Sequence, residues 1–491
     1  MYSILRVWRI KLGAVGWVAM NDTRTRTVDV AVIGAGTAGL AAYRAARKAG
    51  KRALLIEAGA YGTTCARVGC MPSKLLIAAA EAAHHATHAR PFGVSATVAI
   101  DGRAVMDRVR SERDRFVGFV IESVDNIPPE HRLTGRARFT GPDALDVDGT
   151  RVEAPSIVIA TGSSPFIPPV FDAIRDRLIV NDDVFAWEDL PRSVAVFGAG
   201  VIGLELGQAL HRLGVRVRVF GRSGTVGPLG DPVVKEAAAA VLRAELDVDF
   251  DAKVRAVEPE GKTGVAVRFA DADGNERVEH FEAALIAAGR RPNLFDLGVE
   301  RAGIGPDATI DRETLRWGDT HVFVAGDAND DAPLLHEAAD EGTIAGDNAA
   351  RFPDVRTGKR RTPLAIAFTE PALAVVAGGF RAVSERGPFV VGQVDFGDQG
   401  RSRIMLQNKG VARLYADPRS RRFLGAEVAG PRAEHLAHLL AWAHQAELTI
   451  DQMLAMPFYH PVVEEGLRTA LRDVAAKLDA GTTSAGAKTG A

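Results

Sequence analysis

The chain has 491 residues, of which 47% are hydrophobic and 25% are charged, and its formal net charge is −2. This balance is ordinary for a globular protein and gives no bulk reason to expect binding to nucleic acid or to an anionic membrane. The length corresponds to about three domains at roughly 150 residues each. Because the sequence holds only two cysteines, a framework of structural disulfides is excluded, and we expect a reducing, cytoplasmic location.

The first 27 residues precede any regular pattern. Arg6, Arg9 and Lys11 stand before a short apolar run at 12–20, which loosely resembles a signal peptide. That run is too short to span a bilayer, and no other segment has the pattern of a transmembrane helix. We expect residues 1–27 to be a disordered or spurious extension, with export as the alternative.

A strand, a glycine turn and an alanine-rich helix follow. Residues 28–39 contain an apolar strand and then Gly34, Gly36 and Gly39, spaced as G-x-G-x-x-G. These glycines permit a tight turn and the close approach of a pyrophosphate to the helix N-terminus. The next strand ends at Glu57, whose carboxylate would accept hydrogen bonds from ribose hydroxyls and repel a 2′-phosphate. The pattern predicts a site for the unphosphorylated adenosine ribose of FAD or NAD.

Both cysteines lie in one short segment after this site. Cys65 and Cys70 are separated by four residues, and Gly69 and Pro72 would shape the turn between and after them. On a tight helical turn, two such cysteines approach disulfide distance, about 5.5–6 Å between their Cα atoms. A helix N-terminus and the nearby Lys74 would both favour the reactive thiolate. The segment predicts a redox-active dithiol beside the nucleotide site.

The sequence offers no pattern of a metal site. Only two thiols exist, and no histidine pair follows them at the spacing of a zinc finger. His84 and His88 share a helical face, with His85 between them, but no acidic or cysteine ligand accompanies them in a recognisable motif. We therefore expect a solvated helix face there and no bound metal.

The strand, turn and helix pattern recurs in the middle of the chain. Residues 193–203 contain a second apolar strand and a second G-x-G-x-x-G, formed by Gly198, Gly200 and Gly203. Two matches, each after a strand, predict two nucleotide-binding domains. The following strand ends without a carboxylate and is succeeded by Arg222, which favours the 2′-phosphate of NADP. An ordinary solvated arginine is the alternative for that position.

Three further apolar strands end in turns of small residues. The first runs into Ala160, Thr161 and Gly162, the second into Gly289, and the third into Asp327. Prolines at 165, 168 and 169 follow the first of these turns and indicate a crossing between domains. From about residue 362 the pattern changes to short strands, turns and helices, and the tail from about residue 481 has a composition typical of disorder.

These motifs, in their order along the chain, resemble those of the flavoprotein pyridine nucleotide–disulfide oxidoreductases, and among these the dihydrolipoamide dehydrogenases most. The resemblance covers roughly residues 28–475 and includes the dithiol segment, which ends in Pro-Ser-Lys at 72–74. It also includes Ala-Thr-Gly-Ser at 160–163, Ala-Gly-Asp at 325–327, Leu-His-Glu-Ala at 335–338 and His-Pro-Val-Val-Glu-Glu at 460–465.

The resemblance implies an α/β fold with two Rossmann-like nucleotide-binding domains, one for FAD and one for NAD(P), and a C-terminal α+β dimerisation domain. In this division the FAD-binding domain comprises 28–165 and a return segment at 292–361, the NAD(P)-binding domain 166–291, the dimerisation domain 362–480, and the disordered tail 481–491. The FAD-binding residues that it implies are Thr64, Lys74, Ala160, Thr161, Gly162 and Asp327, and Gly289 belongs to the NAD(P) site.

The resemblance also implies roles for the dithiol and its neighbours. Cys65 would be the interchange thiol that attacks or releases substrate sulfur, and Cys70 would face the flavin as the charge-transfer thiolate. Lys74 and Glu205 would pair near the flavin N5 atom, where hydride arrives.

A histidine near the C-terminus would complete the catalytic set. The resemblance implies that His460 shuttles the dithiol proton, that Glu465 orients it, and that both come from the partner subunit of a homodimer. An imidazole held by a carboxylate is chemically suited to this task, because thiol–disulfide exchange needs a proton acceptor near neutral pH.

Two departures from the family pattern concern the substrate and the nucleotide. Arg67 stands between the cysteines where the family has asparagine, residues 62–65 read Gly-Thr-Thr-Cys, and the acid expected at the second ribose is missing. The leading prediction is a dihydrolipoyl dehydrogenase that uses NAD(P) and a dihydrolipoamide-like dithiol. The first alternative is an NADPH-dependent reductase of glutathione-like or other disulfides.

A second alternative is a soluble transhydrogenase or a subunit docked on a 2-oxoacid dehydrogenase complex. The presence of the dithiol argues against transhydrogenation as the main role. Mercuric reduction is disfavoured, because the sequence has neither an N-terminal metal-binding module nor a C-terminal cysteine pair.

Overall fold

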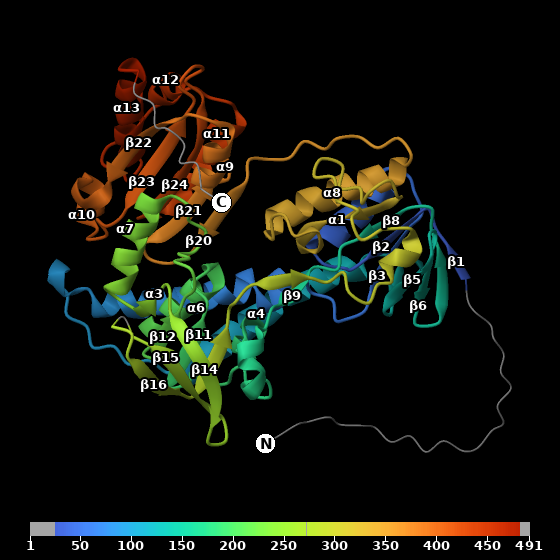
Figure 1. Cartoon of the computed structure of the whole chain (residues 1–491), viewed down its shortest axis with the longest axis horizontal. Helices are drawn as coiled ribbons and strands as arrows, with labels where there is room; N and C mark the ends of the chain where they lie inside the picture. The colour runs from blue at the N-terminus through green and yellow to red at the C-terminus, as the bar shows by residue number, and fades with distance from the viewer. Residues whose placement is uncertain (1–24, 272, 482–491) are drawn as a thin grey trace.

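The computed structural model describes residues 25–271 and 273–481. Figure 1 shows the first nucleotide domain around β2 and α1, the second around β11 and α6, and a C-terminal domain that contains α11 and α13. Of the predicted extension at 1–27, residues 1–24 lie outside the described residues. Thr25–Thr27 form β1, which pairs with β7 in parallel, so regular structure begins three residues earlier than the sequence pattern indicates.

The first domain is built on a five-stranded parallel sheet. Its strands, in spatial order, are β19 (Val322–Val324), β8 (Ile157–Ile159), β2 (Val30–Ile33), β3 (Ala53–Glu57) and β4 (Arg132–Thr134). Strands β2, β8 and β19 are entirely buried, as expected for a parallel sheet covered on both faces. Helices α1 (Thr37–Lys48) and α8 (Leu335–Arg351) lie side by side on one face (Figure 1).

A second, smaller sheet covers the other side of this domain. Its order is β1 (Thr25–Thr27), β7 (Thr150–Glu153), β6 (Ala144–Val147) and β5 (Ala137–Gly141). Phe139 and Leu145 from this sheet are fully buried against Ile33 and Ile159 of the parallel sheet, in one continuous apolar cluster.

The second domain repeats the parallel arrangement. Its sheet runs β10 (Ile179–Val180), β17 (Ala283–Ile286), β11 (Ser193–Phe197), β12 (Arg216–Phe220) and β13 (Asp247–Asp249). Its helices are α5 (Asn181–Val184), α6 (Val201–Arg212) and α7 (Pro232–Arg243), and an antiparallel sheet adds β14 (Lys253–Glu260), β15 (Gly264–Ala270) and β16 (Glu276–Phe281).

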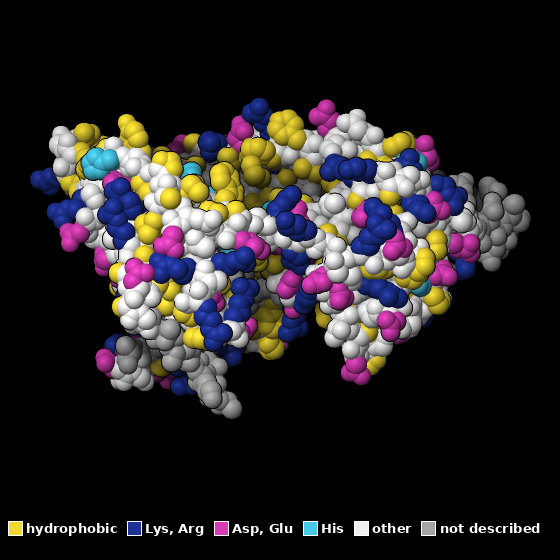
Figure 2. All heavy atoms as spheres, turned by 90° about the horizontal axis from the view of Figure 1, so that it is seen from above, with side chains coloured by type: hydrophobic (Ala, Val, Ile, Leu, Met, Phe, Trp, Pro, Cys, Tyr) yellow, Lys and Arg dark blue, Asp and Glu magenta, His cyan; other side chains and the backbone are white. Residues whose placement is uncertain are grey.

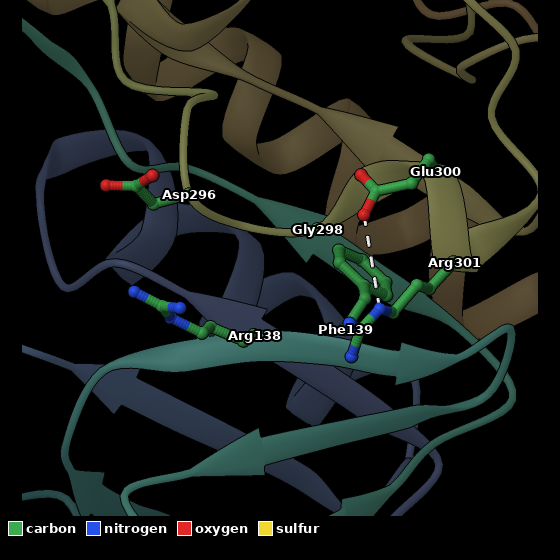
Figure 3. Close-up of a pocket in the computed structure, with 6 residues that line it drawn as sticks. All are labelled: Arg138, Phe139, Asp296, Gly298, Glu300 and Arg301. Carbon is green, nitrogen blue, oxygen red and sulfur yellow. Dashed lines mark ion pairs between the residues drawn. The ribbon is translucent and has the colours of Figure 1, made fainter.

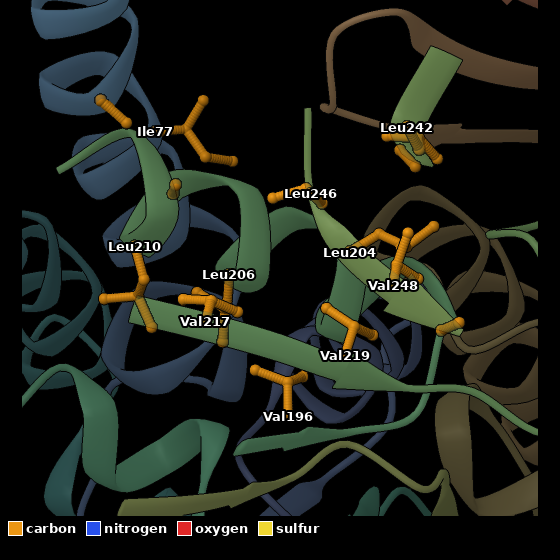
Figure 4. Close-up of a cluster of buried hydrophobic side chains, with 14 of the residues drawn as sticks. Ile77, Val196, Leu204, Leu206, Leu210, Val217, Val219, Leu242, Leu246 and Val248 are labelled. Carbon is orange, nitrogen blue, oxygen red and sulfur yellow. The ribbon is translucent and has the colours of Figure 1, made fainter. Parts of the chain in front are cut away.

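The helix that carries the second cysteine packs onto this second domain. Helix α3 (Cys70–Thr87) follows α2 (Thr64–Val68) and precedes α4 (Gly102–Asp125). Figure 4 shows Ile77 of α3 beside Leu210 of α6, above Val217 of the sheet, and all three belong to one buried cluster. Each such side chain contributes about 1.5–3 kcal/mol on burial. The packing therefore fixes the dithiol segment against the second nucleotide domain.

A short antiparallel ribbon connects the two nucleotide domains. It consists of β9 (Ser163–Pro165) and β18 (Arg290–Pro292), which pair in register. The chain leaves the first domain through β9 and returns to it through β18, so the predicted boundaries at 165/166 and 291/292 both fall at this ribbon.

The C-terminal domain is an antiparallel sheet with helices. Its strands run β20 (Leu364–Ala367), β21 (Ala372–Val376), β24 (Phe423–Gly430), β23 (Val411–Ala416) and β22 (Val390–Asp395). Its helices are α9 (Gly379–Arg386), α10 (Gly400–Ile404), α11 (Ala433–Gln445), α12 (Ile450–Leu454) and α13 (Glu465–Asp479). The predicted α/β fold with a C-terminal α+β domain is thus confirmed. In the described ranges, no helix combines the length and the apolarity needed to cross a membrane.

Candidate active site

The two glycine turns are copies of one geometry. Gly34 has φ of 104°, and a Cβ placed on it would lie 2.3 Å from the carbonyl oxygen of Ala160 on the neighbouring strand end. Gly198 has φ of 121°, and its Cβ would lie 2.2 Å from the carbonyl oxygen of Ala287. Only glycine can occupy these positions, because the backbone is left-handed and no space exists for a side chain.

Of the two remaining glycines in each turn, one is tightly packed and the other faces open space. A Cβ on Gly39 would lie 1.8 Å from the carbonyl oxygen of Gly34, and the equivalent distance at Gly203 is 1.9 Å. By contrast, a Cβ on Gly36 or Gly200 would meet nothing within 4 Å. Each turn thus leaves room at the N-terminus of α1 or α6, where backbone N–H groups attract a pyrophosphate. The residues present fit the nucleotides that the sequence predicts.

Glu57 lies beside the first turn, where the sequence predicts it. Its carboxylate accepts hydrogen bonds from the backbone N–H of Ala35 at 2.7 Å and of Gly59 at 2.8 Å. These bonds fix the carboxylate at the end of β3, next to the helix N-terminus, and its remaining lone pairs are available to ribose hydroxyls.

An acid that sequence reasoning missed, Asp251, lies beside the turn that follows β12. Arg222 is exposed, and in the described part of the chain its guanidinium makes no ion pair. The neighbouring Ser223 donates its backbone N–H to Asp251 at 3.0 Å. The hydrogen bond and charge of Lys253, 2.8 Å away, lower the pKa of Asp251. The parallel pairing of β12 with β13 brings the ends of both strands together, and this pairing is the feature that could have indicated Asp251.

A chain of hydrogen bonds surrounds Asp327 at the end of β19. Ser163 donates its hydroxyl to Asp327 at 2.7 Å, and Arg290 donates Nε–H to the same hydroxyl at 2.8 Å. Thr161 donates its hydroxyl to the carbonyl oxygen of Asn293 at 2.7 Å. The structure thus brings together the predicted residues Thr161 and Asp327 with three that sequence reasoning missed.

Gly162 and Gly289 lie where the connecting ribbon begins. Both have left-handed backbones, with φ of 69° and 112°. The N–H of Asn293 donates to the carbonyl of Gly162, and the N–H of Phe166 donates to the carbonyl of Gly289, each at 2.9 Å. The two glycines therefore turn the chain out of β8 and β17 into the ribbon.

The dithiol occupies a break between two helices. Cys65 lies in α2, Cys70 begins α3, and Gly69 interrupts the helical backbone between them with φ of −127° and ψ of −117°. Thr63 caps α2 by accepting the N–H of Ala66, so Thr64 becomes the first residue of that helix. Both cysteines are free thiols here, with Cys65 half-buried and Cys70 exposed.

The two thiols differ strongly in acidity. The hydrogen bond from Cys65 lowers the pKa of Cys70 to about 7, and the Lys74 ammonium acts in the same direction. The hydrogen bond to Cys70, together with burial, raises the pKa of Cys65. When the pair is reduced at a pH above about 7, Cys70 is therefore the thiolate and Cys65 keeps its proton.

Lys74 and Glu205 meet as the sequence predicts. The ammonium of Lys74 on α3 lies 2.7 Å from Oε2 of Glu205 on α6, and the glutamate is buried. Oε1 of Glu205 accepts the backbone N–H of Phe368 at 2.9 Å, and the ammonium lies 4.5 Å from the centre of the Phe368 ring. Sequence reasoning missed Phe368, which comes from the C-terminal domain.

His460 and Glu465 form the second predicted pair. Nδ1 of His460 lies 2.9 Å from the Glu465 carboxylate, which also binds Arg468 at 2.7 Å. Burial tends to raise the pKa of Glu465. The backbone N–H of Val462, the His460 ring and the Arg468 guanidinium act against this effect, and together they hold the pKa below its ordinary value. The His460 side chain is 80% exposed. Within the described residues, neither His460 nor Glu465 hydrogen-bonds to either cysteine.

The C-terminal domain that carries His460 also exposes large apolar side chains. Tyr459, Met456, Trp442 and Leu439 are all large hydrophobic residues that are exposed on the C-terminal domain. Figure 2 shows hydrophobic side chains gathered over the part of the molecule that this domain forms.

Two other places do not belong to the predicted site. A cavity of about 340 Å³ lies between β5 and the turn at Val299–Ala302, and Figure 3 shows that it is lined by Arg138, Phe139, Asp296, Gly298, Glu300 and Arg301. None of these is a predicted site residue.

The histidines of α3 are the second place: His84 is half-buried 3.8 Å from Glu245 rather than solvated. Among the described residues, no group of three or more side chains could hold a metal.

Comparison with known proteins places this chain in a family. The family model described as pyridine nucleotide-disulphide oxidoreductase matches residues 28–342, and that of the family's dimerisation domain matches residues 364–471. The dihydrolipoyl dehydrogenase of Halobacterium salinarum is 31% identical over 92% of this chain and 97% of its own length. The mercuric reductase of Streptomyces lividans is also 31% identical, over 90% of this chain and 95% of its own length.

A solved structure supports the fold. The HOCl-induced flavoprotein disulfide reductase RclA from Escherichia coli superimposes with a TM-score of 0.74, at 22% identity, over 91% of this chain and 99% of its own. The range matched by the first family model contains the two nucleotide turns and the dithiol, and the range matched by the second lies in the C-terminal domain. The chain therefore belongs to the pyridine nucleotide-disulphide oxidoreductases, a family of FAD-dependent enzymes that use NAD(P).

Proposed function

We propose that this protein is a disulfide oxidoreductase of the dihydrolipoyl dehydrogenase type, which passes two electrons between a dithiol substrate and NAD(P) through Cys65 and Cys70. The observation that carries the proposal is the unequal acidity of the two thiols beside the Lys74–Glu205 pair. Relatives named dihydrolipoyl dehydrogenase, at 31% and 32% identity, support the substrate class. FAD, when bound, relays the electron pair between the dithiol and the nucleotide.

The exchange steps follow from the thiol acidities. A substrate thiolate attacks Sγ of Cys65 in the Cys65–Cys70 disulfide, the bond between the two cysteine sulfurs breaks, and Cys70 leaves as a thiolate. Its lowered pKa makes it a good leaving group. The second substrate thiolate then attacks the substrate sulfur that is bound to Cys65, the bond between that sulfur and Cys65 breaks, and the substrate leaves as a disulfide. Of the two substrate protons, one passes through His460 to the released Cys65 thiolate and the other stays on His460, while Cys70 remains a thiolate.

We propose that His460 of the partner subunit serves each dithiol in a homodimer. The dimerisation-domain model, the exposure of His460 and the exposed apolar residues of the same domain support this arrangement. Glu465 holds Nδ1 of His460, which leaves Nε2 available to accept the proton. Attachment to a 2-oxoacid dehydrogenase complex and a cytoplasmic location stay predictions.

The second candidate is an NADPH-dependent reductase of other disulfides. It is favoured by Arg222, which is exposed after β12, and by Arg67, which is exposed in α2 between the cysteines. Arg222 suits a 2′-phosphate, and Arg67 would attract a substrate that carries carboxylates, as glutathione does. Asp251 acts against the 2′-phosphate, although Lys253 partly neutralises its charge.

A steady-state assay separates these functions. Dihydrolipoamide is supplied with NAD⁺ or NADP⁺, and in parallel oxidised glutathione or mercuric ion is supplied with NADPH. The proposal predicts turnover of dihydrolipoamide that disappears in the Cys65→Ser variant. If dihydrolipoamide is not oxidised with either nucleotide, the leading proposal is wrong, and reduction of glutathione disulfide would then support the second candidate.

A further inference from the structure

A buried polar network joins α7 of the second nucleotide domain to the sheet of the C-terminal domain. Asp231, which caps α7, is fully buried. Its carboxylate lies 2.6 and 2.7 Å from Nη1 of Arg413, and it accepts the Tyr415 hydroxyl at 2.8 Å. Arg413 and Tyr415 are two positions apart on β23 and therefore lie on one face of the sheet. The cap of α7 is thus fixed to another domain.

Glu427 extends this network from the adjacent strand. It lies opposite Arg413 in the register of β23 and β24. Its Oε2 accepts the backbone N–H groups of Gly230 at 2.9 Å and Asp231 at 2.8 Å, and its Oε1 accepts that of Phe380 at 2.9 Å. Both oxygens of this buried carboxylate are therefore used by the backbone, and two of the three donors lie just before α7.

The backbone that Glu427 holds belongs to the second nucleotide site. Residues 221–231 connect β12 to α7 and carry Arg222 at their start. Halfway along, Gly227 donates its N–H to the carbonyl of Ala199, inside the second glycine turn, at 2.9 Å. This segment, which we call the nucleotide loop, therefore contacts the glycine turn at one point and the C-terminal domain at another.

The network contains more hydrogen bonds than the capping of a helix requires. An N-cap needs one side-chain oxygen, and Asp231 already accepts the N–H groups of Val233 at 2.9 Å and Val234 at 3.4 Å. Burying two carboxylates is costly unless each is fully paired. The bonds from Arg413 and Tyr415 meet this condition for Asp231, and three backbone N–H groups meet it for Glu427. Their structural effect is to fix the nucleotide loop relative to the C-terminal domain.

We propose that Asp231 and Glu427 are positioning residues for NAD(P), which hold the nucleotide loop against the second glycine turn from the C-terminal domain. This inference rests on the proposed function, because it takes the second turn to bind NAD(P). The adenosine end of the nucleotide lies at the end of β12 in such a site, so the loop sets the position of Arg222 relative to the ribose.

The Glu427→Gln variant tests this role sharply. An amide offers one acceptor oxygen and one NH₂ donor, so it cannot accept from Phe380 and from the Gly230–Asp231 pair together. We expect the KM for the nucleotide to rise about tenfold, while kcat and the KM for the dithiol change less than about twofold. Tyr415→Phe removes one hydroxyl and keeps the ring, and should raise the nucleotide KM by about two- to threefold.

Binding without turnover provides an independent measurement. Calorimetric titration of the holoenzyme with ADP-ribose and with 2′-phospho-ADP-ribose should give dissociation constants that rise in both variants by the same factors as KM. Glu370→Gln is the matched control, because Glu370 binds Arg212 at 2.8 Å and so joins the same two domains without touching the nucleotide loop. Its dissociation constants should equal those of the wild type.

The outcomes distinguish this role from others. Unchanged dissociation constants in Tyr415→Phe and Glu427→Gln would overturn the inference, and so would an equal rise in Glu370→Gln, since domain docking in general would then be responsible. If Glu427→Gln fails to fold, Tyr415→Phe decides alone. Wild-type protein that oxidises dihydrolipoamide but binds neither probe would overturn the inference and leave the dithiol chemistry intact.

Discussion

At the scale of single residues, the chemistry depends on the difference between two thiols five positions apart. Cys70 is acidified by the Cys65 hydrogen bond and then by Lys74, whereas Cys65 keeps its proton. The positive charge that acidifies Cys70 is itself held by the buried Glu205. One ion pair therefore links the acidity of the dithiol to the second nucleotide domain.

This difference predicts the pH dependence of the reduced holoenzyme. The pKa of Cys70 is lowered to about 7, so the long-wavelength thiolate–flavin absorbance should be present above this pH and disappear as pH falls through it. Lys74→Met should move the midpoint to higher pH, because the ammonium favours the thiolate. Cys65→Ser should keep the absorbance and Cys70→Ser should lack it; absorbance that persists in Cys70→Ser contradicts the assignment.

Glu205 provides a second prediction at this scale. In Glu205→Gln the Lys74 ammonium loses its buried counter-charge, and we expect the rate of flavin reduction by NAD(P)H to fall about tenfold. Stopped-flow absorbance of the holoenzyme measures this rate. Glu81→Gln, on the exposed side of α3, is the control and should keep the wild-type rate. If the flavin is reduced at the same rate in all three proteins, Glu205 does not contribute to flavin reduction by NAD(P)H.

At the scale of elements, the chemistry lies at the carboxyl ends of parallel strands. In the second domain, the ends of β12 and β13 bring Arg222 and Asp251 to the same place, and the two side chains have opposite preferences for a 2′-phosphate. Because a long segment separates Arg222 from Asp251 along the chain, the sequence does not show that these two residues are neighbours.

Arg222 therefore yields a prediction about nucleotide choice. Arg222→Ala should lower kcat/KM for NADPH about tenfold and leave the value for NADH nearly unchanged, because only the 2′-phosphate needs the guanidinium. Arg216→Ala, at the opposite end of β12, is the control and should alter neither value. A uniform loss for both nucleotides would show that Arg222 does not read the 2′-phosphate.

The sequence predicts elements better than the contacts between them. The glycine spacing of both turns indicates the strand, turn and helix units, since the requirement for glycine is local. The contacts of Ser163 with Asp327 and of Phe368 with Glu205 join residues more than one hundred positions apart, and no local pattern encodes them. The strand at Thr25–Thr27 escaped prediction because its partner strand is β7.

At the scale of the whole molecule, the dithiol and its proposed proton acceptor lie in different domains. Within the described residues of one chain, His460 contacts Glu465 but neither cysteine. The exposed apolar residues of the C-terminal domain are surface that a second copy would cover in the proposed homodimer.

Hybrid dimers test this arrangement. Cys65→Ser and His460→Gln should each be inactive in dithiol oxidation as pure proteins, because one lacks the sulfur that the substrate attacks and the other lacks the proton acceptor. Co-refolded in equal amounts, they should recover about a quarter of wild-type activity, since half of the dimers would contain one complete site of two. If the mixture stays as inactive as its components, the site does not span two chains.

The most direct test of the central claim is a count of thiols, because this chain holds only Cys65 and Cys70. The oxidised holoenzyme is denatured and titrated with a thiol reagent before and after anaerobic reduction by NADPH or NADH. If the two cysteines form the redox disulfide that exchanges electrons with the nucleotide, the count per chain rises from none to two. A count that is the same before and after reduction would contradict the account.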